Sequence, residues 1–370
     1  MATLYLHIPF CKRICPYCDF YKVGATELLP SVVEMMHREM EQRAEFLPSK
    51  NITSIYFGGG TPSLLQPKDI ERLIDKARTL FDCHNVSEIT IEANPDDITA
   101  HYISELRTTS VNRISLGIQS FDDAVLGFMN RRHNAQGAID AIERLRKAGY
   151  DNISIDLIFG ITGFGNDHLR HSLQRAIELE AEHISAYHLT IEERTRLAIM
   201  VRKAEYTPID EEGSEREYLL VHDTLTKAGY DHYEISNYAR NNRYAQHNSA
   251  YWQGVDYLGI GAGAHSFATD TRTWCSSTAK EYSQGVFLYQ SEELTERDHL
   301  NEYVMTSLRT ARGIDIHYLS TRFGNSALQN IMHAAEPWLQ SGTLRNVEGR
   351  LFIPAEKFLL SDAVIESLFA

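Results

Sequence analysis

The regular alternation of short apolar runs with longer amphipathic segments over residues 1–230 is the feature that most constrains the fold of this chain. The runs are rich in Ile, Val, Leu, Phe and Tyr, as buried strands are, and they span residues 4–8, 52–57, 88–92, 113–118, 153–159 and 183–189. The stretches between them are long enough for a helix, which is the usual connection between parallel strands. The pattern predicts an α/β fold with six β/α units, either an incomplete, TIM-like barrel or a wide open sheet.

Helical periodicity in the intervening stretches supports this fold class. In residues 30–47, apolar side chains recur at three- and four-residue steps and so share one face of a helix. Residues 135–148 and 215–229 also read as helices, and Gly149 and Gly229 stand where a glycine would end them. We therefore expect helices between the predicted strands.

The composition and the hydrophobic pattern of the sequence change after residue 230. This change predicts that the chain has three parts. Residues 1–230 form the partial barrel. Residues 231–290, rich in Tyr, Asn, Gly and His, form a connecting segment. Residues 291–370 form a smaller C-terminal α+β domain that ends in a hairpin, with Glu348 and Gly349 at its turn.

Three of the five cysteines, Cys11, Cys15 and Cys18, lie close together directly after the first predicted strand. Clustered thiols in an odd total disfavour a secreted disulfide framework and favour metal binding in a reducing cytoplasm. Thiolates are the usual ligands of iron–sulfur clusters, and three ligands leave one iron of a four-iron cluster open. A zinc site is the alternative, with His7 or Asp19 as the fourth ligand.

The charge and the hydropathy of the chain restrict the classes of partner that it can bind. The formal net charge is −14 and no Lys- or Arg-rich run occurs, which disfavours nucleic acid as a partner. No apolar stretch approaches the roughly 18 residues that span a bilayer, and the N-terminus does not read as a signal peptide. We expect a cytoplasmic protein.

Small and polar residues gather where the predicted strands end. The segments are FGGGTPS at 57–63, IEANP at 91–95, SLGIQSF at 115–121 and DLIFG at 156–160. Carboxyl ends of parallel strands meet at one edge, where α/β proteins build their sites. Glycines let a ligand approach the backbone, and the fork of Arg131 suits a carboxylate.

These segments, together with the Cx3Cx2C spacing, resemble the radical S-adenosylmethionine superfamily, and in particular its oxygen-independent coproporphyrinogen oxidase-like group. The resemblance implies a partial (β/α)6 barrel of the radical-SAM type, with a [4Fe–4S] cluster on Cys11, Cys15 and Cys18. It also implies that the cofactors, the cluster and S-adenosylmethionine, are contacted by residues near the strand ends: Tyr5, Tyr17, Gly59, Gly60, Thr61, Glu92, Gln119, Arg131 and Asp156.

Two features separate branches of this group. The porphyrinogen-oxidising members carry a further cysteine two places after the third cluster cysteine, where this chain has Phe20. Residues 247–252, HNSAYW, match the HNxxYW pattern of the HemW-type haem chaperones. The resemblance therefore favours a haem chaperone, and the alternative is an oxygen-independent coproporphyrinogen III oxidase.

The HNxxYW residues suit haem chemically. His247 can ligate haem iron, Asn248 can orient the imidazole, and Tyr251 and Trp252 can cover a macrocycle. Alternatively, the aromatic residues anchor the two domains to each other. The resemblance implies haem or a porphyrin as ligand, a reductant protein for the cluster, and acceptors such as respiratory haem enzymes, with peripheral membrane association.

Overall fold

A computed structural model describes all 370 residues, and its centre is a curved parallel sheet. The six predicted strands are present and pair in chain order, each parallel to the next. They are β1 (Ala2–Ile8), β2 (Ile52–Gly59), β3 (Glu88–Ala93), β4 (Arg113–Gln119), β5 (Ile153–Phe159) and β6 (His183–His188). The prediction of a partial (β/α)6 barrel is confirmed.

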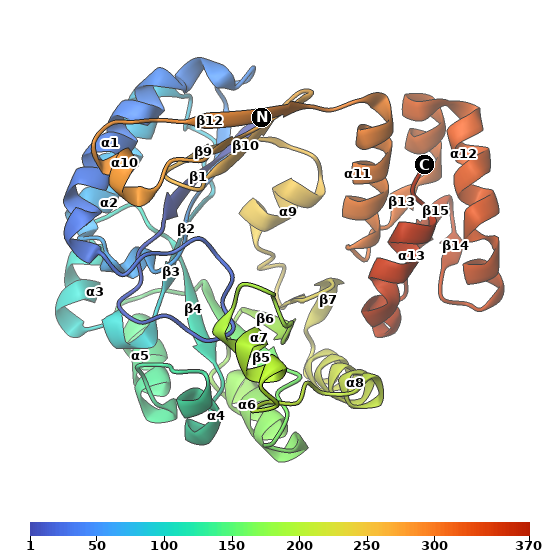
Figure 1. Cartoon of the computed structure of the whole chain (residues 1–370), viewed down its shortest axis with the longest axis horizontal. Coiled ribbons are helices and arrows are strands. Elements are labelled where there is room, and N and C mark those ends of the chain that lie inside the picture. The colour runs from blue at the N-terminus through green and yellow to red at the C-terminus, as the bar shows by residue number, and fades with distance from the viewer.

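Helices cover the outside of this sheet, as Figure 1 shows. They bury their apolar faces against the strands, which read as continuous apolar runs because both of their faces are covered. The helices are α1 (Leu29–Gln42), α2 (Pro67–Leu80), α3 (Ala100–Leu106), α4 (Asp123–Phe128), α5 (Ala135–Lys147), α6 (Asn166–Glu178), α7 (Arg196–Arg202) and α8 (Glu211–Lys227).

Residues predicted as a connecting segment extend the sheet at both edges. Beyond β6 lie β8 (Asn237–Ala239) and β7 (Asp231–Glu234), both antiparallel to their neighbours. At the other edge β9 (Asp256–Ile260) pairs parallel to β1. The antiparallel strands β10 (His265–Ala268), β11 (Thr271–Cys275) and β12 (Tyr289–Glu293) continue outward from β9, with α10 (Ala279–Ser283) between β11 and β12. The sheet therefore has twelve strands.

One short helix of this segment, α9 (Gln246–Trp252), lies between the barrel and the C-terminal residues in Figure 1. Both oxygens of the Glu88 carboxylate accept hydrogen bonds from the first backbone N–H groups of α9, at 2.9 and 3.0 Å. Glu88 is the first residue of β3, so α9 is held at the amino ends of the barrel strands. This is the end opposite to the predicted cofactor residues.

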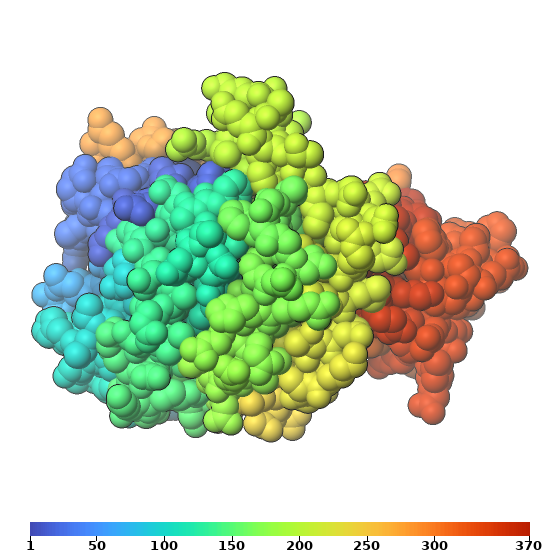
Figure 2. Space-filling model, turned by 90° about the horizontal axis from the view of Figure 1, so that it is seen from below, coloured from blue at the N-terminus to red at the C-terminus, as the bar shows by residue number.

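The C-terminal residues form a lobe at one end of the molecule, which the space-filling view in Figure 2 also shows. The lobe contains α11 (Glu296–Leu308), α12 (Ile316–Gln340, kinked at Gly324), α13 (Ser361–Ser367) and a small sheet of β13 (Ile314–Asp315), β14 (Arg345–Val347) and β15 (Arg350–Phe352). Glu348 and Gly349 form the hairpin turn with φ of 51° and 77°, the backbone that a tight two-residue turn requires. No helix is both long and apolar enough to cross a bilayer.

Candidate functional site

The three clustered cysteines lie on the long loop that follows β1, and backbone hydrogen bonds hold the two ends of this loop together. The Cys11 N–H donates to the carbonyl of Val23 at 3.1 Å, and the Val23 N–H donates to the carbonyl of Pro9 at 2.7 Å. Cys11 is buried, and Cys15 and Cys18 are partly exposed. The loop therefore presents its thiols at the carboxyl end of the barrel.

A carboxylate from the third β/α connection fastens this loop to the barrel. Asp97 accepts hydrogen bonds from Lys12 in the loop, from Ser63 after β2 and from Arg132 after α4, each at 2.9 Å. Asp97 is almost fully buried. Because three segments share one carboxylate, the cysteine loop has a defined position over the strand ends.

Polar groups from the predicted site approach the thiols directly. The Thr61 hydroxyl donates to Cys11 Sγ at 3.4 Å, and Arg131 Nη1 donates to Cys15 Sγ at 3.5 Å. Burial raises the pKa of the Cys11 thiol, and the Thr61 hydrogen bond opposes that effect. No three His, Cys, Asp or Glu side chains are grouped to hold a single metal ion. A hydroxyl, a guanidinium and three thiols at one strand edge fit a thiolate-held iron–sulfur cluster.

The glycine turn after β2 packs against β1 and against the start of the cysteine loop. Gly59 has a φ of 112°, and a Cβ there would lie 2.6 Å from the ring of His7. A Cβ on Gly60 would lie 2.7 Å from the carbonyl oxygen of Phe10. Only glycine fits these two positions, so the turn brings its backbone next to the thiols.

Two carboxylates, Glu92 at the end of β3 and Asp156 in β5, point into the barrel mouth. Burial raises the pKa of Glu92 to about 7, and hydrogen bonds from the Tyr56 hydroxyl at 2.8 Å and the Gly59 N–H at 3.1 Å only partly offset this rise. Burial likewise raises the pKa of Asp156 to about 6. Half-buried carboxylates that have no ion-pair partner are suited to accept an ammonium or ribose hydroxyls from a ligand.

Arg131 links the thiols to the end of β4. Its Nη2 donates to Asn94 Oδ1 at 2.6 Å and approaches the Gly117 carbonyl, while its Nε has no partner although it is buried. Gln119 has a φ of 73°, which is rare for a residue other than glycine. An unsatisfied guanidinium N–H and a strained residue at one strand end are typical of a ligand site.

The two tyrosines of the predicted set have different surroundings. The Tyr5 hydroxyl is 3.0 Å from His7 Nδ1, which leaves the buried His7 Nε2 without a partner. Tyr17 packs against the small apolar cluster that contains Val125 and Met129. Burial raises the pKa of both tyrosines. Tyr5 is therefore held beside His7, and Tyr17 beside apolar side chains that follow β4.

His247 lies in the barrel interior and both of its ring nitrogens have partners. Nδ1 is 2.8 Å from the Ser54 hydroxyl and Nε2 is 3.1 Å from the Tyr251 hydroxyl. Its ring stacks on Tyr56 with 4.9 Å between centroids, and burial lowers its pKa to about 3. Ligation of haem iron by His247 stays a prediction, and it requires one of these two hydrogen bonds to break.

The other HNxxYW residues, Asn248, Tyr251 and Trp252, are partly exposed on α9. The guanidinium of Arg309, at the end of α11, lies 4.7 Å from the Trp252 ring centroid, and Arg309 also pairs with Glu234 at 3.0 Å. Trp252 therefore contacts the C-terminal lobe, as the domain-anchoring alternative expects. Its indole N–H is buried without a partner.

Sequence reasoning missed three residues that organise the site: Asn94, Asp97 and Tyr56. Asn94 bridges Arg131 and Thr61, with its Nδ2 3.3 Å from the threonine hydroxyl. The Asn-Pro-x-Asp spacing after β3 was a visible signal for Asn94 and Asp97. Tyr56 carried no such signal, because its partners are distant in the sequence.

This chain is similar to a superfamily model and to individual known proteins. The Radical SAM superfamily model matches residues 5–176. The heme chaperone HemW of Bacillus subtilis is 32% identical over 372 residues, covering 98% of both chains. The heme chaperone HemW of Lactococcus lactis is 31% identical and covers 98% of this chain and 96% of the relative.

Among solved structures, the coproporphyrinogen III oxidase HemN of Escherichia coli, a radical SAM enzyme, superposes with a TM-score of 0.84. The match covers all of this chain and 90% of HemN at 22% identity, which supports the fold alone. The full-length identity to the HemW proteins carries the assignment: the chain belongs to the HemW family of the radical S-adenosylmethionine superfamily.

Proposed function

We propose that this protein is a haem chaperone that carries a [4Fe–4S] cluster on Cys11, Cys15 and Cys18 and binds S-adenosylmethionine beside it. The observation that carries the proposal is the placement of Thr61 and Arg131 against two of the three thiols, in a chain of the HemW family. A ligand bound there would lie beside the thiols that hold the cluster and beside the strand-end residues at the same time.

Different residues of the chain bind different parts of S-adenosylmethionine. Arg131 pairs with the ligand carboxylate through its unsatisfied N–H, and the backbone of Gly59 and Gly60 lets the ligand approach. Glu92 and Asp156 accept from the ligand's ammonium and ribose, while Gln119 and Tyr5 line the remaining sides. A cluster held by Cys11, Cys15 and Cys18 would supply an electron for the sulfonium, while the protein orients the ligand and excludes water.

The presence of Phe20 favours a haem chaperone over an enzyme that oxidises porphyrinogens. This residue stands where the oxidases have a further cysteine, and its side chain is 70% exposed, so the loop offers no fourth thiol there. We propose that Tyr251 and Trp252 on α9 contact haem, with Asn248 and His247 as the adjoining residues. The protein passes the haem to acceptors such as respiratory haem enzymes, from a cytoplasmic location with peripheral membrane association, and a reductant protein serves the cluster.

Anaerobic reconstitution tests the cluster. We expect about four irons and four sulfides per chain in the wild type, and loss of the cluster when Cys11, Cys15 or Cys18 is replaced by Ala. Replacement of Cys83 by Ala is the matched control and should leave the iron content unchanged. A stoichiometric zinc content after the same preparation would replace the cluster by the zinc alternative.

Two assays run in parallel test the choice of function. Haem titration of the reconstituted protein should shift the Soret band, and transfer to an apo-haem protein should follow. Incubation with coproporphyrinogen III, S-adenosylmethionine and a reductant should give no protoporphyrinogen. Turnover in the second assay would make the protein an oxidase and would contradict the proposal.

A further inference from the structure

The cysteine loop carries the most exposed large apolar side chains of the molecule after the N-terminal Met1. Phe20 is 70% exposed and Ile14 is 52% exposed. Ile14 directly precedes Cys15, and Phe20 follows two residues after Cys18, and both of these cysteines are partly exposed themselves. Large apolar side chains that face solvent beside a site are typical of a surface that a partner covers.

The helix α7 adjoins this loop and extends the same surface. The backbone N–H of Leu197, in the first turn of α7, donates to the carbonyl of Pro16 in the loop at 2.8 Å. Figure 1 shows the dark-blue loop after β1 running beside α7, and Figure 2 shows the yellow-green segment around α7 projecting from the molecule. Ile199 on α7 is 43% exposed. Residues 12–22 and 194–203 therefore form one surface, the loop–α7 face.

The loop–α7 face is positively charged although the whole chain has a net charge of −14. Residues 12–22 contain three cations and one acid, and residues 194–203 contain four cations and no acid. In the loop, Lys12 pairs with Asp97 at 2.9 Å. The exposed cations of the face that form no ion pair are Arg13, Arg194, Arg196, Arg202 and Lys203. Their charge therefore remains available to a partner.

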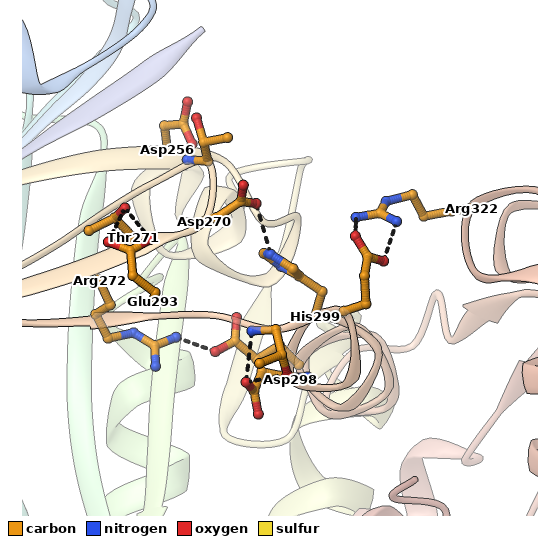
Figure 3. Close-up of polar contacts among 12 residues, drawn as sticks. Asp256, Asp270, Thr271, Arg272, Glu293, Asp298, His299 and Arg322 are labelled. Carbon is orange, nitrogen blue, oxygen red and sulfur yellow. Dashed lines mark hydrogen bonds and ion pairs between the residues drawn. The ribbon is translucent and has the colours of Figure 1, made fainter.

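Arginines between the sheet edge and the C-terminal lobe are paired with acids of the chain instead. Arg272 of β11 pairs with Glu302 of α11 and with Glu292 of β12, as Figure 3 shows in part. Arg322 of α12 pairs with Glu296 of α11 at 2.7 Å, also in Figure 3. Positive charge is neutralised within the chain at that contact, whereas the loop–α7 face keeps an excess that attracts an acidic surface.

The mixture of charges on the loop–α7 face and at its border favours an acidic protein over an anionic lipid surface. Asp19 on the loop is exposed, and so are Glu192, Glu193 and Glu205 on either side of α7. A uniformly anionic bilayer would meet these acids together with the cations and would lose part of its attraction. A protein can match both signs of charge with a complementary pattern.

We propose that the loop–α7 face docks a small acidic protein that carries a one-electron centre and reduces the cluster. The inference rests on the proposed function and adds the docking place and the charge of the reductant protein. Ile14, Phe20 and Ile199 supply apolar contacts, and the unpaired cations attract the acidic partner. With a flavin donor, the hydroquinone anion becomes the neutral semiquinone and the oxidised cluster gains the electron, so one electron and no proton moves.

Stopped-flow reduction of the reconstituted, full-length protein by a reduced acidic flavodoxin tests this face, with bleaching of the cluster absorbance as the readout. Arg202→Glu/Lys203→Glu changes only exposed side chains and should lower the bimolecular rate constant about 10-fold at low ionic strength. Added salt should slow the wild type more than this variant, because salt screens the attraction. The affinity for oxidised flavodoxin should also fall about 10-fold in the variant, and this measurement needs no electron transfer.

Arg297→Glu/Arg312→Glu in the C-terminal lobe is the matched control. Both arginines are exposed and form no ion pair, so this variant removes the same amount of positive charge from a different surface. Its rate constant and its affinity for flavodoxin should equal those of the wild type. A small reductant, photoreduced deazaflavin, should reduce the cluster of all three proteins at one rate, which shows that the cluster is intact in each.

The outcomes distinguish this inference from the function it rests on. Wild-type reduction and wild-type affinity in Arg202→Glu/Lys203→Glu would overturn the docking face, and an equal loss in the matched control would assign the effect to net charge alone and overturn it too. Sedimentation with vesicles of anionic lipid that is lost in the α7 variant, while reduction by flavodoxin is unchanged, would make the face a membrane contact. Failure of the wild type to assemble a cluster would overturn the proposed function, and the docking of a reductant with it.

Discussion

Replacing Glu92 by Gln should stabilise the protein without cofactors and at the same time remove binding of S-adenosylmethionine. Burial, with a smaller contribution from the nearby Asp156, raises the pKa of Glu92 from an ordinary 4.5 to about 7. The fold therefore prefers the protonated carboxyl, and ionising Glu92 costs free energy of folding. Glutamine resembles the protonated form, because its oxygen can accept from Gly59 and its amide can donate to Tyr56.

The size of the effect follows from the pKa of Glu92. One pKa unit is worth about 1.4 kcal/mol, so full ionisation costs the wild type about 3 kcal/mol. Because the folded pKa is raised, this cost is nearly absent below pH 4.5, grows as pH rises from 4.5 to 7, and is constant above about pH 8. The advantage of Glu92→Gln should therefore be below about 1 kcal/mol at pH 5 and about 3 kcal/mol at pH 8.5.

Urea denaturation of the apo-protein at pH 5, 7 and 8.5 measures this difference, and calorimetric titration measures S-adenosylmethionine binding. Glu143, on the outside of α5, is exposed and makes no ion pair, so Glu143→Gln serves as the control and should change neither property. A Glu92→Gln variant that is less stable than the wild type at pH 8.5, or whose advantage does not grow with pH, would refute the account of a strained carboxylate held ready for a cation.

The remaining predictions concern the glycine turn and the buried histidine. Gly59→Ala should lower the free energy of unfolding by about 2 kcal/mol or more, because φ is 112° and the new Cβ would meet the His7 ring at 2.6 Å. Gly127→Ala, a helical site with nothing within 4 Å, should be neutral or slightly stabilising in the same denaturation experiment. His247→Ala should cost about 2–4 kcal/mol at pH 7, since it deletes a buried ring and orphans Ser54 and Tyr251. Because the pKa of His247 is lowered to about 3, its contribution is present above pH 6.5 and is lost as pH falls towards 3, so the variant should lose less stability than the wild type over that range. An identical acid profile for the two proteins would contradict this.

Local sequence patterns were sufficient to predict the barrel. Each of the six strands has its own apolar run, and the structure moves their ends by only one or two residues. The cysteine spacing and the segments after β2 to β5 were also sufficient to predict the place of the site. The reason is that parallel strands bring their carboxyl ends to one edge of the sheet wherever the strands occur in the sequence. The placement of Gly59, Glu92 and Asp156 around one mouth therefore follows from the sequence by itself.

Long-range pairing decided the rest. The strand β9 returns to lie parallel to β1, and Glu88 binds the start of α9 across 158 residues of sequence. No local sequence pattern predicts such partners, because a buried polar group forms hydrogen bonds with the groups that the completed fold brings near it. His247 reads as an available ligand in the sequence, whereas in the fold Ser54 and Tyr251 occupy both nitrogens. The contact between Trp252 on α9 and Arg309 likewise exists only because the C-terminal lobe docks beside α9, and that docking is a property of the tertiary structure.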